Sequence, residues 1–299
     1  SMTPQLCLGT AQFGLAYGIT NTNGQVSEAK VGQLLFEANK SGICWLDTAQ
    51  AYGNAETVLG RQLPAAHGFH LISKLPAQPQ PMFTAQDVEA WDQAFHISCK
   101  RLGVQSLNAL LLHAPADLGK PGGQHLEAWL LGLRQQGLVQ RIGVSIYSAK
   151  DLDGVNPALL DLVQLPLSLY DQRALMDGTL TLLRARGTAI HARSLYLQGL
   201  LLTPAAQWPG WVSAEVRTHQ RALEALAEQR GCQLIDLALG FAREQLDLEA
   251  VVLGVCSSDE LTALQNSWAA ISPWKEGESQ TWCLQNADIL DPRLWPTNS

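Results

Sequence analysis

The sequence predicts a single-domain α/β protein of the (β/α)8 TIM-barrel class, and three observations support this prediction. Short apolar runs alternate with longer amphipathic segments from residue 6 to residue 269, which is the order that builds a parallel sheet. Eight such pairs can be recognised, and eight is the number that closes into a barrel. A length of 299 residues and a hydrophobic content of 46% suit one barrel, which typically needs about 250 residues. No G-x-G-x-x-G motif follows the first run, so a Rossmann domain would lack its phosphate-binding turn.

The expected strands are the short apolar runs, and the expected helices are the amphipathic segments between them. Ser27 is a suitable N-cap for the first long helix, and Gly42, Gly137 and Gly187 end helical segments. Strands are expected at residues 6–9, 43–46, 70–74, 107–113, 142–146, 162–165, 189–193 and 250–254. Helices are expected at residues 27–40, 54–63, 84–102, 123–136, 173–186 and 258–269, with a short piece near 148 and helical structure through 214–244. Residues 272–299 form a C-terminal tail with little periodicity, which is expected near the barrel mouth or side.

Composition and charge limit the partners of this protein. A net charge of −7 and a pI near 5.5 argue against nonspecific binding to nucleic acid or to anionic membranes. The longest apolar stretches are too short to span a bilayer, and no signal peptide is expected. Ser1 and Met2 are interpreted as a cloning remnant. Six scattered cysteines without a C-x-x-C pair are typical of reduced thiols, so a cytoplasmic protein is expected.

Polar side chains stand where three consecutive expected strands end. Asp47 and Tyr52 follow the second strand, Lys74 ends the third, and His113 ends the fourth. The carboxyl ends of barrel strands meet on one face, and neighbouring strands lie about 4.8 Å apart, so these side chains can meet. Each one alone has an ordinary structural explanation, such as a solvated lysine or a hydrogen-bonded histidine at a strand end. Their convergence is what indicates a catalytic site.

This set of side chains suits proton transfer to or from a carbonyl or alcohol oxygen, with Tyr52 as the candidate acid. A free phenol has a pKa of about 10, and a lysine ammonium about 4 Å away favours the phenolate by about 4 kcal/mol at an effective dielectric constant near 20, although burial opposes this effect. Asp47 would hold Lys74 charged and in place, and a neutral His113 could donate a hydrogen bond to the substrate oxygen. None of the four is a hydride source, so a reduction needs a cofactor.

Several motifs resemble the aldo-keto reductase superfamily in their order and spacing. They are Leu8-Gly9-Thr10, the run from Asp47 to Gly53 with Glu56 and Gly60, Ser73-Lys74, the run from Leu111 to Pro115, Gly143-Val144-Ser145, Gln164, and Ser194 with Gly199-Leu200-Leu201. The resemblance covers about residues 6–264. It implies a barrel that binds NAD(P)H without a Rossmann fold and reduces an aldehyde or ketone. Asp47, Tyr52, Lys74 and His113 match the catalytic tetrad of that family.

The resemblance also implies a cofactor site along the barrel mouth. Ser145 and Gln164 match positions that hold the nicotinamide carboxamide, although both could simply complete hydrogen bonds at strand ends. An aromatic residue commonly stacks on the nicotinamide after the seventh strand, where this sequence has Arg193, with Tyr196 as a substitute three residues on. The residues expected to bind the cofactor are Gly9, Thr10, Ala11, Asp47, Ser145, Gln164, Arg193, Ser194, Leu195, Tyr196, Gly199, Gly254, Ser257 and Glu260.

The run after the eighth strand bears on the choice between NAD and NADP. Family members often place basic residues there against the 2′-phosphate of NADPH, but residues 254–261 contain none and offer Asp259 and Glu260. A carboxylate suits a ribose hydroxyl and repels a phosphate, so NAD(H) is favoured while both cofactors stay open. The same acids would also suit the first turn of a helix, with Ser257 or Ser258 as its N-cap.

The sequence leaves three functions open. The first is reduction of a small-molecule carbonyl substrate by an NAD(P)H-dependent oxidoreductase with Tyr52 as general acid. The second is a cofactor-sensing or partner-binding barrel with little turnover, which the altered cofactor loops suggest. The third is a lyase that forms a Schiff base on Lys74. The histidine spacing predicts no metal cluster, and the protein is expected to be a monomer or a small homo-oligomer.

Overall fold

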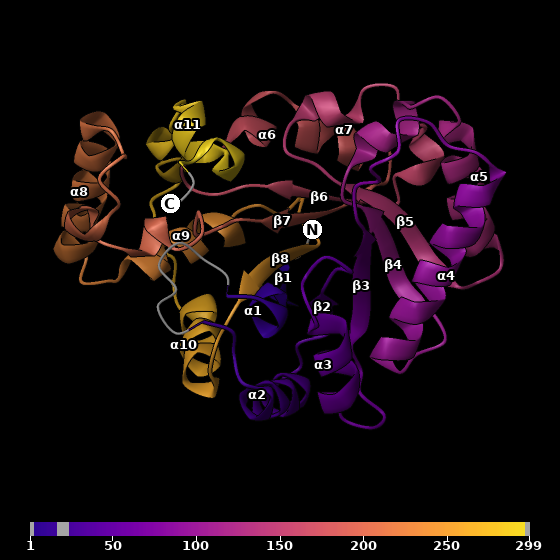
Figure 1. Cartoon of the computed structure of the whole chain (residues 1–299). Helices are drawn as coiled ribbons and strands as arrows, with labels where there is room; N and C mark the ends of the chain where they lie inside the picture. The colour runs from indigo at the N-terminus through magenta and orange to yellow at the C-terminus, as the bar shows by residue number, and fades with distance from the viewer. Residues whose placement is uncertain (1–2, 17–23, 297–299) are drawn as a thin grey trace.

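Eight parallel strands form a closed barrel in the order β1 to β8, and β8 pairs with β1 to complete the ring. The computed structural model describes residues 3–16 and 24–296, so the interpretation of Ser1 and Met2 lies outside the described residues. The arrangement confirms the predicted (β/α)8 fold (Figure 1). The strands are β1 Gln5–Gly9, β2 Trp45–Asp47, β3 His70–Leu75, β4 Leu107–Leu112, β5 Val139–Ser145, β6 Leu162–Pro166, β7 Ala189–Arg193 and β8 Ala250–Gly254.

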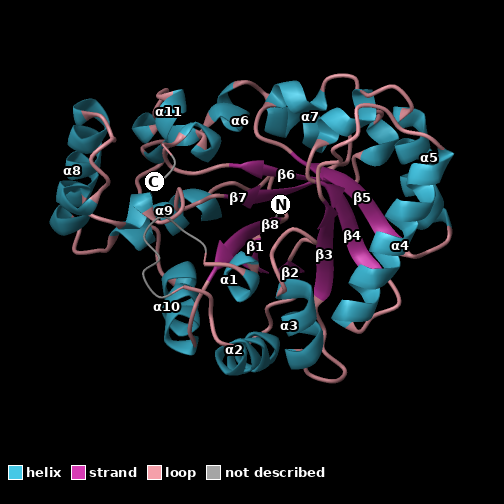
Figure 2. Ribbon diagram, viewed as in Figure 1, coloured by secondary structure: helices cyan, strands magenta, loops and turns pink. Residues whose placement is uncertain are grey.

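The helices form a layer outside the strands (Figure 2). Helix α4 shows how the sequence sets helix ends, because Thr84 and Asp87 form a capping box at its start and Gly103 ends it with a φ of 72°. Within the described ranges, no helix combines the length and the apolar character needed to cross a membrane. The helices are α1 Ala11–Gly14, α2 Glu28–Lys40, α3 Ala55–Gln62, α4 Ala85–Leu102, α5 Gly123–Gln135, α6 Arg173–Met176, α7 Thr179–Ala185, α8 Ala214–Gln229, α9 Leu234–Arg243, α10 Ser258–Ala269 and α11 Ala287–Leu290.

The continuous helix expected at residues 173–186 is wrong, because the chain breaks there into α6 and α7. Gly178 takes a φ of 80°, which a helix interior does not allow. Oδ1 of Asp177 accepts hydrogen bonds from both the backbone N–H and the hydroxyl of Thr179, at 2.9 and 2.6 Å. The aspartate thus satisfies a backbone donor at the start of the new helix, which favours the break over a continuous helix.

Alternation along the strands divides the apolar side chains between two cores. The larger core lies between the strands and the outer helices, and the smaller one fills the barrel. Its members are Cys7, Trp45, Ile72, Ala109, Leu111, Leu162, Ala189 and Ala250. Because successive side chains point to opposite faces of a strand, positions two or four residues further along also point inward. At the carboxyl ends of the strands, here called the barrel mouth, these positions are Gly9, Asp47, Lys74, His113, Gln164, Arg193 and Gly254. Ser145 is the register partner of Gln164 and shares its inward face.

The opposite end of the barrel is closed by a polar network. Arg141 donates two hydrogen bonds to the carboxylate of Glu249, 2.7 and 3.2 Å long. Nε2 of the buried His191 lies 3.0 Å from Glu249 Oε1, and the Trp45 indole donates to Gln5 Oε1 at 2.7 Å. This end of a TIM barrel serves stability, so the functional site is sought at the mouth.

The C-terminal tail runs from the helix layer to the barrel mouth. Near its start, Nε1 of Trp274 donates to the carbonyl oxygen of Leu237 on α9 at 2.8 Å. Near its end, Cζ of Arg293 lies 3.6 Å from the ring centroid of Tyr147, which follows β5. The described part of the tail therefore reaches the mouth, as the sequence predicted.

Candidate active site

Asp47 and Lys74 form a buried ion pair in the barrel mouth. Nζ of Lys74 lies 2.7 Å from Asp47 Oδ2 and 2.9 Å from the carbonyl oxygen of Thr48. The side chain of Lys74 is 0% exposed and that of Asp47 is 4% exposed. Burial lowers the pKa of Lys74, but the carboxylate of Asp47, followed by the hydroxyl of Tyr52, outweighs it and leaves the pKa raised. Lys74 is therefore a fixed ammonium group beneath the mouth.

Tyr52 and His113 complete the group beside Lys74. The ring centroid of Tyr52 lies 5.1 Å from Lys74 Nζ and 6.0 Å from the ring centroid of His113. Both rings are partly exposed, whereas Lys74 is buried. Burial, together with the charge of Lys74, lowers the pKa of His113 to about 4. His113 is therefore neutral near pH 7, and the structure brings all four predicted catalytic residues together.

The turn that carries Tyr52 depends on two glycines. Gly53 has a φ of 54°, and a Cβ atom at this position would lie 2.2 Å from the carbonyl oxygen of Gly14. A Cβ atom on Gly14 would lie 1.8 Å from the carbonyl oxygen of Tyr52. Helix α1 therefore packs directly on the backbone of this turn, which fixes the position of the phenol.

Gln164 binds the carboxylate oxygen of Asp47 that Lys74 does not use. Its Nε2 donates to Asp47 Oδ1 at 2.8 Å, so both carboxylate oxygens have partners. Ser145 on β5 is the register neighbour of Gln164 on β6, and both side chains are buried. The two polar groups expected to hold a carboxamide thus lie side by side. Gln164 also makes a hydrogen bond at its strand end, which the sequence analysis gave as the alternative to binding a carboxamide.

Glycines line the mouth where β1 and β8 meet. Gly9 and Gly254 are register partners, and neither has a side chain to fill the mouth. The buried amide of Gln12 on α1 lies beside them, where Nε2 donates to the carbonyl oxygens of Gly9 and Val255, both at 3.0 Å. A Cβ atom on Gly254 would lie 2.9 Å from this amide. The β1–β8 side of the mouth is therefore shaped by backbone and by one buried amide.

Thr10 and Ala11 connect this side to Asp47. The backbone N–H and the hydroxyl of Thr10 both donate to the carbonyl oxygen of Asp47, at 3.0 and 2.9 Å. Ala11 begins α1 and is buried. Thr10 therefore fixes the position of the β2 end as well as its own.

The loop after β7 has an uncommon backbone. Ser194, Leu197 and Gln198 have φ values of 60°, 49° and 55°, and Gly199 follows with 99°. Such conformations cost on the order of 1–3 kcal/mol each for residues other than glycine, and they cluster at ligand-binding sites. The side chain of Leu195 is buried in the outer core, so its backbone is the part that could contact a cofactor.

Arg193 and Tyr196, the two candidates for stacking on nicotinamide, differ in environment. Arg193 points into the mouth, where Nη2 donates to the carbonyl oxygen of Ile146 at 2.7 Å and Cζ lies 4.7 Å from the Tyr147 ring centroid. Tyr196 packs against the outer core. Burial, and then the charge of Glu260, raises the pKa of Tyr196. Arg193 is thus the candidate whose side chain faces the mouth.

The acids after β8 lie at the start of α10. Oγ of Ser257 accepts a hydrogen bond from the Glu260 backbone at 3.1 Å, and Oε2 of Glu260 accepts one from the Cys256 backbone at 2.6 Å. Asp259 is exposed in the same helical turn. Ser257 and Glu260 therefore cap the helix, which is the structural alternative that the sequence had raised for them.

The family model described as the aldo/keto reductase family matches residues 5–276. This range contains all eight strands and the strand-end residues of the mouth from Gly9 to Gly254. The chain belongs to the aldo/keto reductase family. The resemblance found in the sequence motifs is thereby confirmed.

Relatives of this aldo/keto reductase family member match parts of the chain at moderate identity. An aldo-keto reductase of Mycolicibacterium vanbaalenii is 32% identical over 139 residues, which cover 44% of this chain and 46% of that protein. An aldo-keto reductase of Mycolicibacterium smegmatis is 30% identical over 215 residues, 67% of this chain and 71% of that protein. The chain thus spans about half the length of the first of these relatives. An aldo-keto reductase from Bacillus halodurans, solved in its holo form, shares the fold with a TM-score of 0.71 and 20% identity over 98% of this chain and 94% of that one.

Three features of the mouth escaped the sequence analysis. Gln12 bridges β1 to the loop after β8, and its only sequence signal is an amide between the apolar residues after the first strand. The hydrogen bond from Gln164 to Asp47 and the contact of Arg293 with Tyr147 join residues far apart in the chain. No local pattern signals such contacts, so only the folded barrel reveals them.

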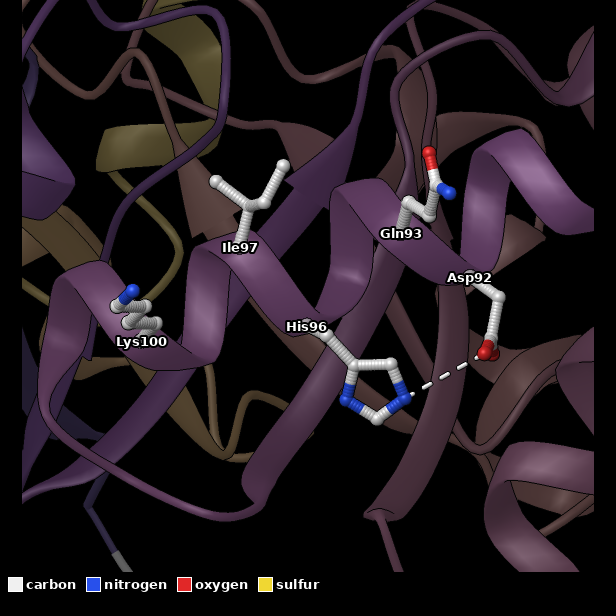
Figure 3. Close-up of a pocket in the computed structure, with 5 residues that line it drawn as sticks. All are labelled: Asp92, Gln93, His96, Ile97 and Lys100. Carbon is white, nitrogen blue, oxygen red and sulfur yellow. Dashed lines mark ion pairs between the residues drawn. The ribbon is translucent and has the colours of Figure 1, made fainter.

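A shallow hollow on the outer face of α4 lies outside the barrel (Figure 3). Figure 3 shows its lining residues, Asp92, Gln93, His96, Ile97 and Lys100, on this one helix. Nε2 of His96 lies 3.4 Å from Asp92 Oδ2, and both side chains are about half exposed, so neither is held in a protected environment. Across the described parts of the chain, no group of three or more His, Cys, Asp or Glu residues is placed to hold a metal ion. The strand-end residues of the mouth are therefore the candidate site.

Proposed function

We propose that this protein is an NAD(P)H-dependent oxidoreductase that reduces an aldehyde or ketone to an alcohol, with Tyr52 as the general acid. The observation that carries the proposal is the Asp47–Lys74 pair, buried at 2.7 Å beside a partly exposed phenol and a neutral imidazole. This arrangement supplies one fixed positive charge, one proton donor and one neutral hydrogen-bond donor around the same opening. Membership of the aldo/keto reductase family supports the same reaction class.

Each member of the tetrad has a separate role in the proposed reaction. Tyr52 gives its proton to the carbonyl oxygen as negative charge develops there. Lys74 stabilises the charge left on the phenol oxygen, by about 3 kcal/mol for a unit charge at the 5.1 Å between Nζ and the ring centroid and an effective dielectric constant near 20. Asp47 keeps Lys74 charged, because burial would otherwise favour the neutral amine. His113 donates a hydrogen bond to the carbonyl oxygen and so orients the substrate.

The mouth fits a nicotinamide dinucleotide as cofactor. Gly9 and Gly254 contribute no side chains of their own to the β1–β8 side, which leaves their backbone beside the buried Gln12 amide for a flat ring to approach. The hydroxyl of Ser145 and the amide oxygen of Gln164 can bind a carboxamide. The reduced nicotinamide supplies the hydride, which none of the four tetrad residues can provide. The loop from Ser194 to Gly199 contributes backbone groups in uncommon conformations.

The proposal includes a preference for NADH over NADPH. Residues 254–261 contain no basic side chain, so a 2′-phosphate would meet no positive charge from this segment. Glu260 adds a negative charge at the same place, although its carboxylate also caps α10. Titration of the purified protein with each cofactor, followed by tryptophan fluorescence, measures the preference. Tighter binding of NADPH would contradict this part of the proposal.

The test of the proposed acid is the variant Tyr52→Phe. Removing the hydroxyl removes the proton donor, so kcat is expected to fall at least about 100-fold, the lower end of general acid catalysis. Fluorescence titration is expected to give a cofactor Kd within about twofold of the wild-type value, because the aromatic ring remains. An unchanged kcat with a weakened cofactor Kd would assign Tyr52 to binding and would contradict the proposal.

The environment of Lys74 speaks against the Schiff-base alternative. A lysine must be neutral and accessible to attack a carbonyl carbon, but Lys74 is 0% exposed and held by Asp47. Its pKa is raised rather than lowered. Borohydride treatment in the presence of substrate is therefore expected to leave no adduct on Lys74. A single-turnover experiment distinguishes the oxidoreductase from a cofactor-sensing barrel. The oxidoreductase is expected to oxidise bound NAD(P)H when it is mixed with aldehydes, whereas a barrel without turnover would leave the cofactor reduced.

A further inference from the structure

Glu56 is a buried carboxylate outside the tetrad. It lies in the first turn of α3, the helix that follows Tyr52, and its side chain is 3% exposed. A buried charge is unfavourable unless hydrogen bonds compensate for the lost hydration. The partners of Glu56 therefore show which parts of the fold this carboxylate holds together.

Two buried serine hydroxyls provide this compensation, one at each carboxylate oxygen. Oε2 of Glu56 accepts a hydrogen bond from the hydroxyl of Ser73 on β3 at 2.8 Å, and Oε1 accepts one from the hydroxyl of Ser98 on α4 at 3.0 Å. Nη1 of the half-exposed Arg101 lies 3.8 Å from Oε1. The carboxylate thus joins α3 to one strand of the barrel and to the next helix.

The link to β3 is made beside Lys74. Ser73 directly precedes Lys74, and successive side chains point to opposite faces of a strand. Lys74 therefore points into the mouth, while Ser73 points outward to α3, where it is fully buried. A hydrogen bond to Ser73 thus fixes α3 relative to the backbone that carries the ammonium group.

The other end of this connection is Tyr52. The backbone N–H of Ala55, the first residue of α3, donates to the carbonyl oxygen of Tyr52 at 3.0 Å, so the helix begins directly on the turn that holds the phenol. A helical turn moves as a unit because its backbone is hydrogen-bonded. A displacement of Glu56 relative to β3 would therefore displace Tyr52 relative to Lys74, whose Nζ lies 5.1 Å from the centroid of the phenol ring.

Close packing on α4 fixes Glu56 from a second side. A Cβ atom on Gly60 would lie 1.7 Å from the carbonyl oxygen of Arg101, so α3 and α4 meet backbone to backbone. The hydrogen bond from Ser98 to Glu56 joins the same two helices. The carboxylate therefore lies at the junction of α3, α4 and β3, and its hydrogen bonds set their relative positions.

We propose that Glu56 is a positioning residue, which holds the turn of Tyr52 against β3 so that the phenol keeps its place beside the ammonium group of Lys74. The inference rests on the proposed carbonyl reduction and adds a residue to its machinery. An ionised carboxylate suits this role because it only accepts hydrogen bonds and can take one donor from each of two elements. The reaction is sensitive to such positions, since a misplacement of about 1 Å can cost about 100-fold in rate.

The test compares Glu56→Met with Glu56→Gln. Methionine keeps the length of the side chain but removes both carboxylate oxygens, whereas glutamine keeps one oxygen to accept from Ser73 and offers an N–H to the hydroxyl oxygen of Ser98. In Glu56→Met, kcat per bound cofactor is expected to fall about tenfold or more, with KM and the cofactor Kd within about twofold of the wild-type values. Glu56→Gln is expected to keep kcat within about threefold of the wild-type value. Because kcat is counted per bound cofactor, from the end point of the fluorescence titration, unfolded protein does not contribute to the loss.

Ser73→Ala is a second variant, which removes only the link to β3. It deletes one hydroxyl and leaves Glu56 bound to Ser98, so kcat is expected to fall about threefold or more with an unchanged KM. The matched control is Ser279→Ala, which deletes another buried serine hydroxyl, one that donates to Glu244 at the end of α9 at 2.9 Å. Its kcat is expected to stay within about twofold of the wild-type value. A wild-type kcat in both Glu56→Met and Ser73→Ala, or an equal loss in Ser279→Ala, would overturn the proposal.

Fluorine NMR of protein labelled with 3-fluorotyrosine gives a readout that needs no turnover. The chain has five tyrosines, and the resonance missing from Tyr52→Phe identifies Tyr52. This resonance is expected to shift or broaden in Glu56→Met and to keep its wild-type position in Glu56→Gln and Ser279→Ala. If it does so while no aldehyde is reduced, the proposed reduction fails and the positioning role stands. Reduction of aldehydes by Glu56→Met at the wild-type rate, with an unchanged Tyr52 resonance, would overturn the positioning role alone.

Discussion

Replacing Asp47 by Asn removes the charge that neutralises Lys74. The lysine side chain is 0% exposed, and its partner carboxylate is 4% exposed and 2.7 Å away. Removing one partner of a buried ion pair typically costs about 3–5 kcal/mol, because the remaining charge is left without compensation. Thr48 still accepts a hydrogen bond from Lys74, so we expect a loss near the lower limit, about 3 kcal/mol in the free energy of unfolding at pH 7.

A double-mutant cycle separates the pair from its surroundings. Lys74→Met replaces the ammonium by an apolar chain of similar length and leaves a buried carboxylate with Gln164 as its partner, so a comparable loss is expected. The double variant with both changes leaves no unpaired charge and is expected to lie within about 1.5 kcal/mol of the wild type. The coupling energy from urea unfolding should therefore be about 4.5 kcal/mol, the sum of the two single losses less that of the double variant.

The raised pKa of Lys74 also sets how the stability contributed by the Asp47–Lys74 pair depends on pH. The pKa of Lys74 is raised in the folded protein, so its contribution is complete below the pKa of an unfolded lysine. It is lost only as the pH rises through the folded pKa, above the ordinary lysine range. The coupling energy should thus be the same at pH 6 and pH 8.

The exposed pair of Arg61 and Glu28, 3.3 Å apart with side chains 58% and 38% exposed, provides the control cycle. Its coupling energy is expected to stay below about 1 kcal/mol, as for other surface pairs. If the effects of changing Asp47 and Lys74 simply add within about 0.5 kcal/mol, the reasoning from a buried, mutually dependent pair is refuted.

Two further predictions concern acid stability and backbone packing. The pKa of His113 is about 4 in the folded protein and about 6.5 when unfolded, so the unfolded state binds more protons between these values. Lowering the pH from 7 to 5 should therefore reduce the free energy of unfolding of the wild type by about 2 kcal/mol more than that of His113→Gln, measured by urea unfolding. Equal losses in the two proteins would contradict the lowered pKa. In the barrel, Gly143→Ala would place Cβ 1.8 Å from the carbonyl oxygen of Leu162 and should lower stability by about 3 kcal/mol. On α5, Gly132→Ala meets no atom closer than 3.8 Å and should raise stability by about 0.5–1 kcal/mol, so similar effects of these two changes on Tm would contradict the packing argument.

Elements with strong local signals could be predicted from the sequence. The eight strands are short apolar runs, and α4 has a capping residue, Thr84, and a terminating Gly103 at the expected places. The prediction at residues 173–186 was wrong because its helical pattern contains Asp177 and Gly178. A helix tolerates such residues when packing favours continuity, whereas here a side-chain cap to Thr179 favours a break. The outcome depends on packing that the local pattern does not contain.

The four tetrad residues could be proposed from the sequence because strand alternation and chain order place them. Trp45 and Asp47 share one face of β2, and Ile72 and Lys74 share one face of β3. Because Trp45 and Ile72 point into the barrel, Asp47 and Lys74 at the strand ends point into its mouth. Ser257 and Glu260 could not be assigned in the same way. A carboxylate at a helix start suits either a ribose or a cap, and only the hydrogen bond from Cys256 shows which contact it makes.

The sequence by itself determined the barrel and the polar residues at its strand ends, because both follow from periodicity and strand order. Only the tertiary structure decided which of the charges there are neutralised. Arg293 is paired with Asp291, two residues before it in the chain, while Arg193 has neutral partners from the loop after β5. The reason is that ion pairing depends on separations of a few ångströms between groups. For Arg193 such separations are set by Ile146 and Tyr147, which are distant in the chain and meet it only when the barrel closes.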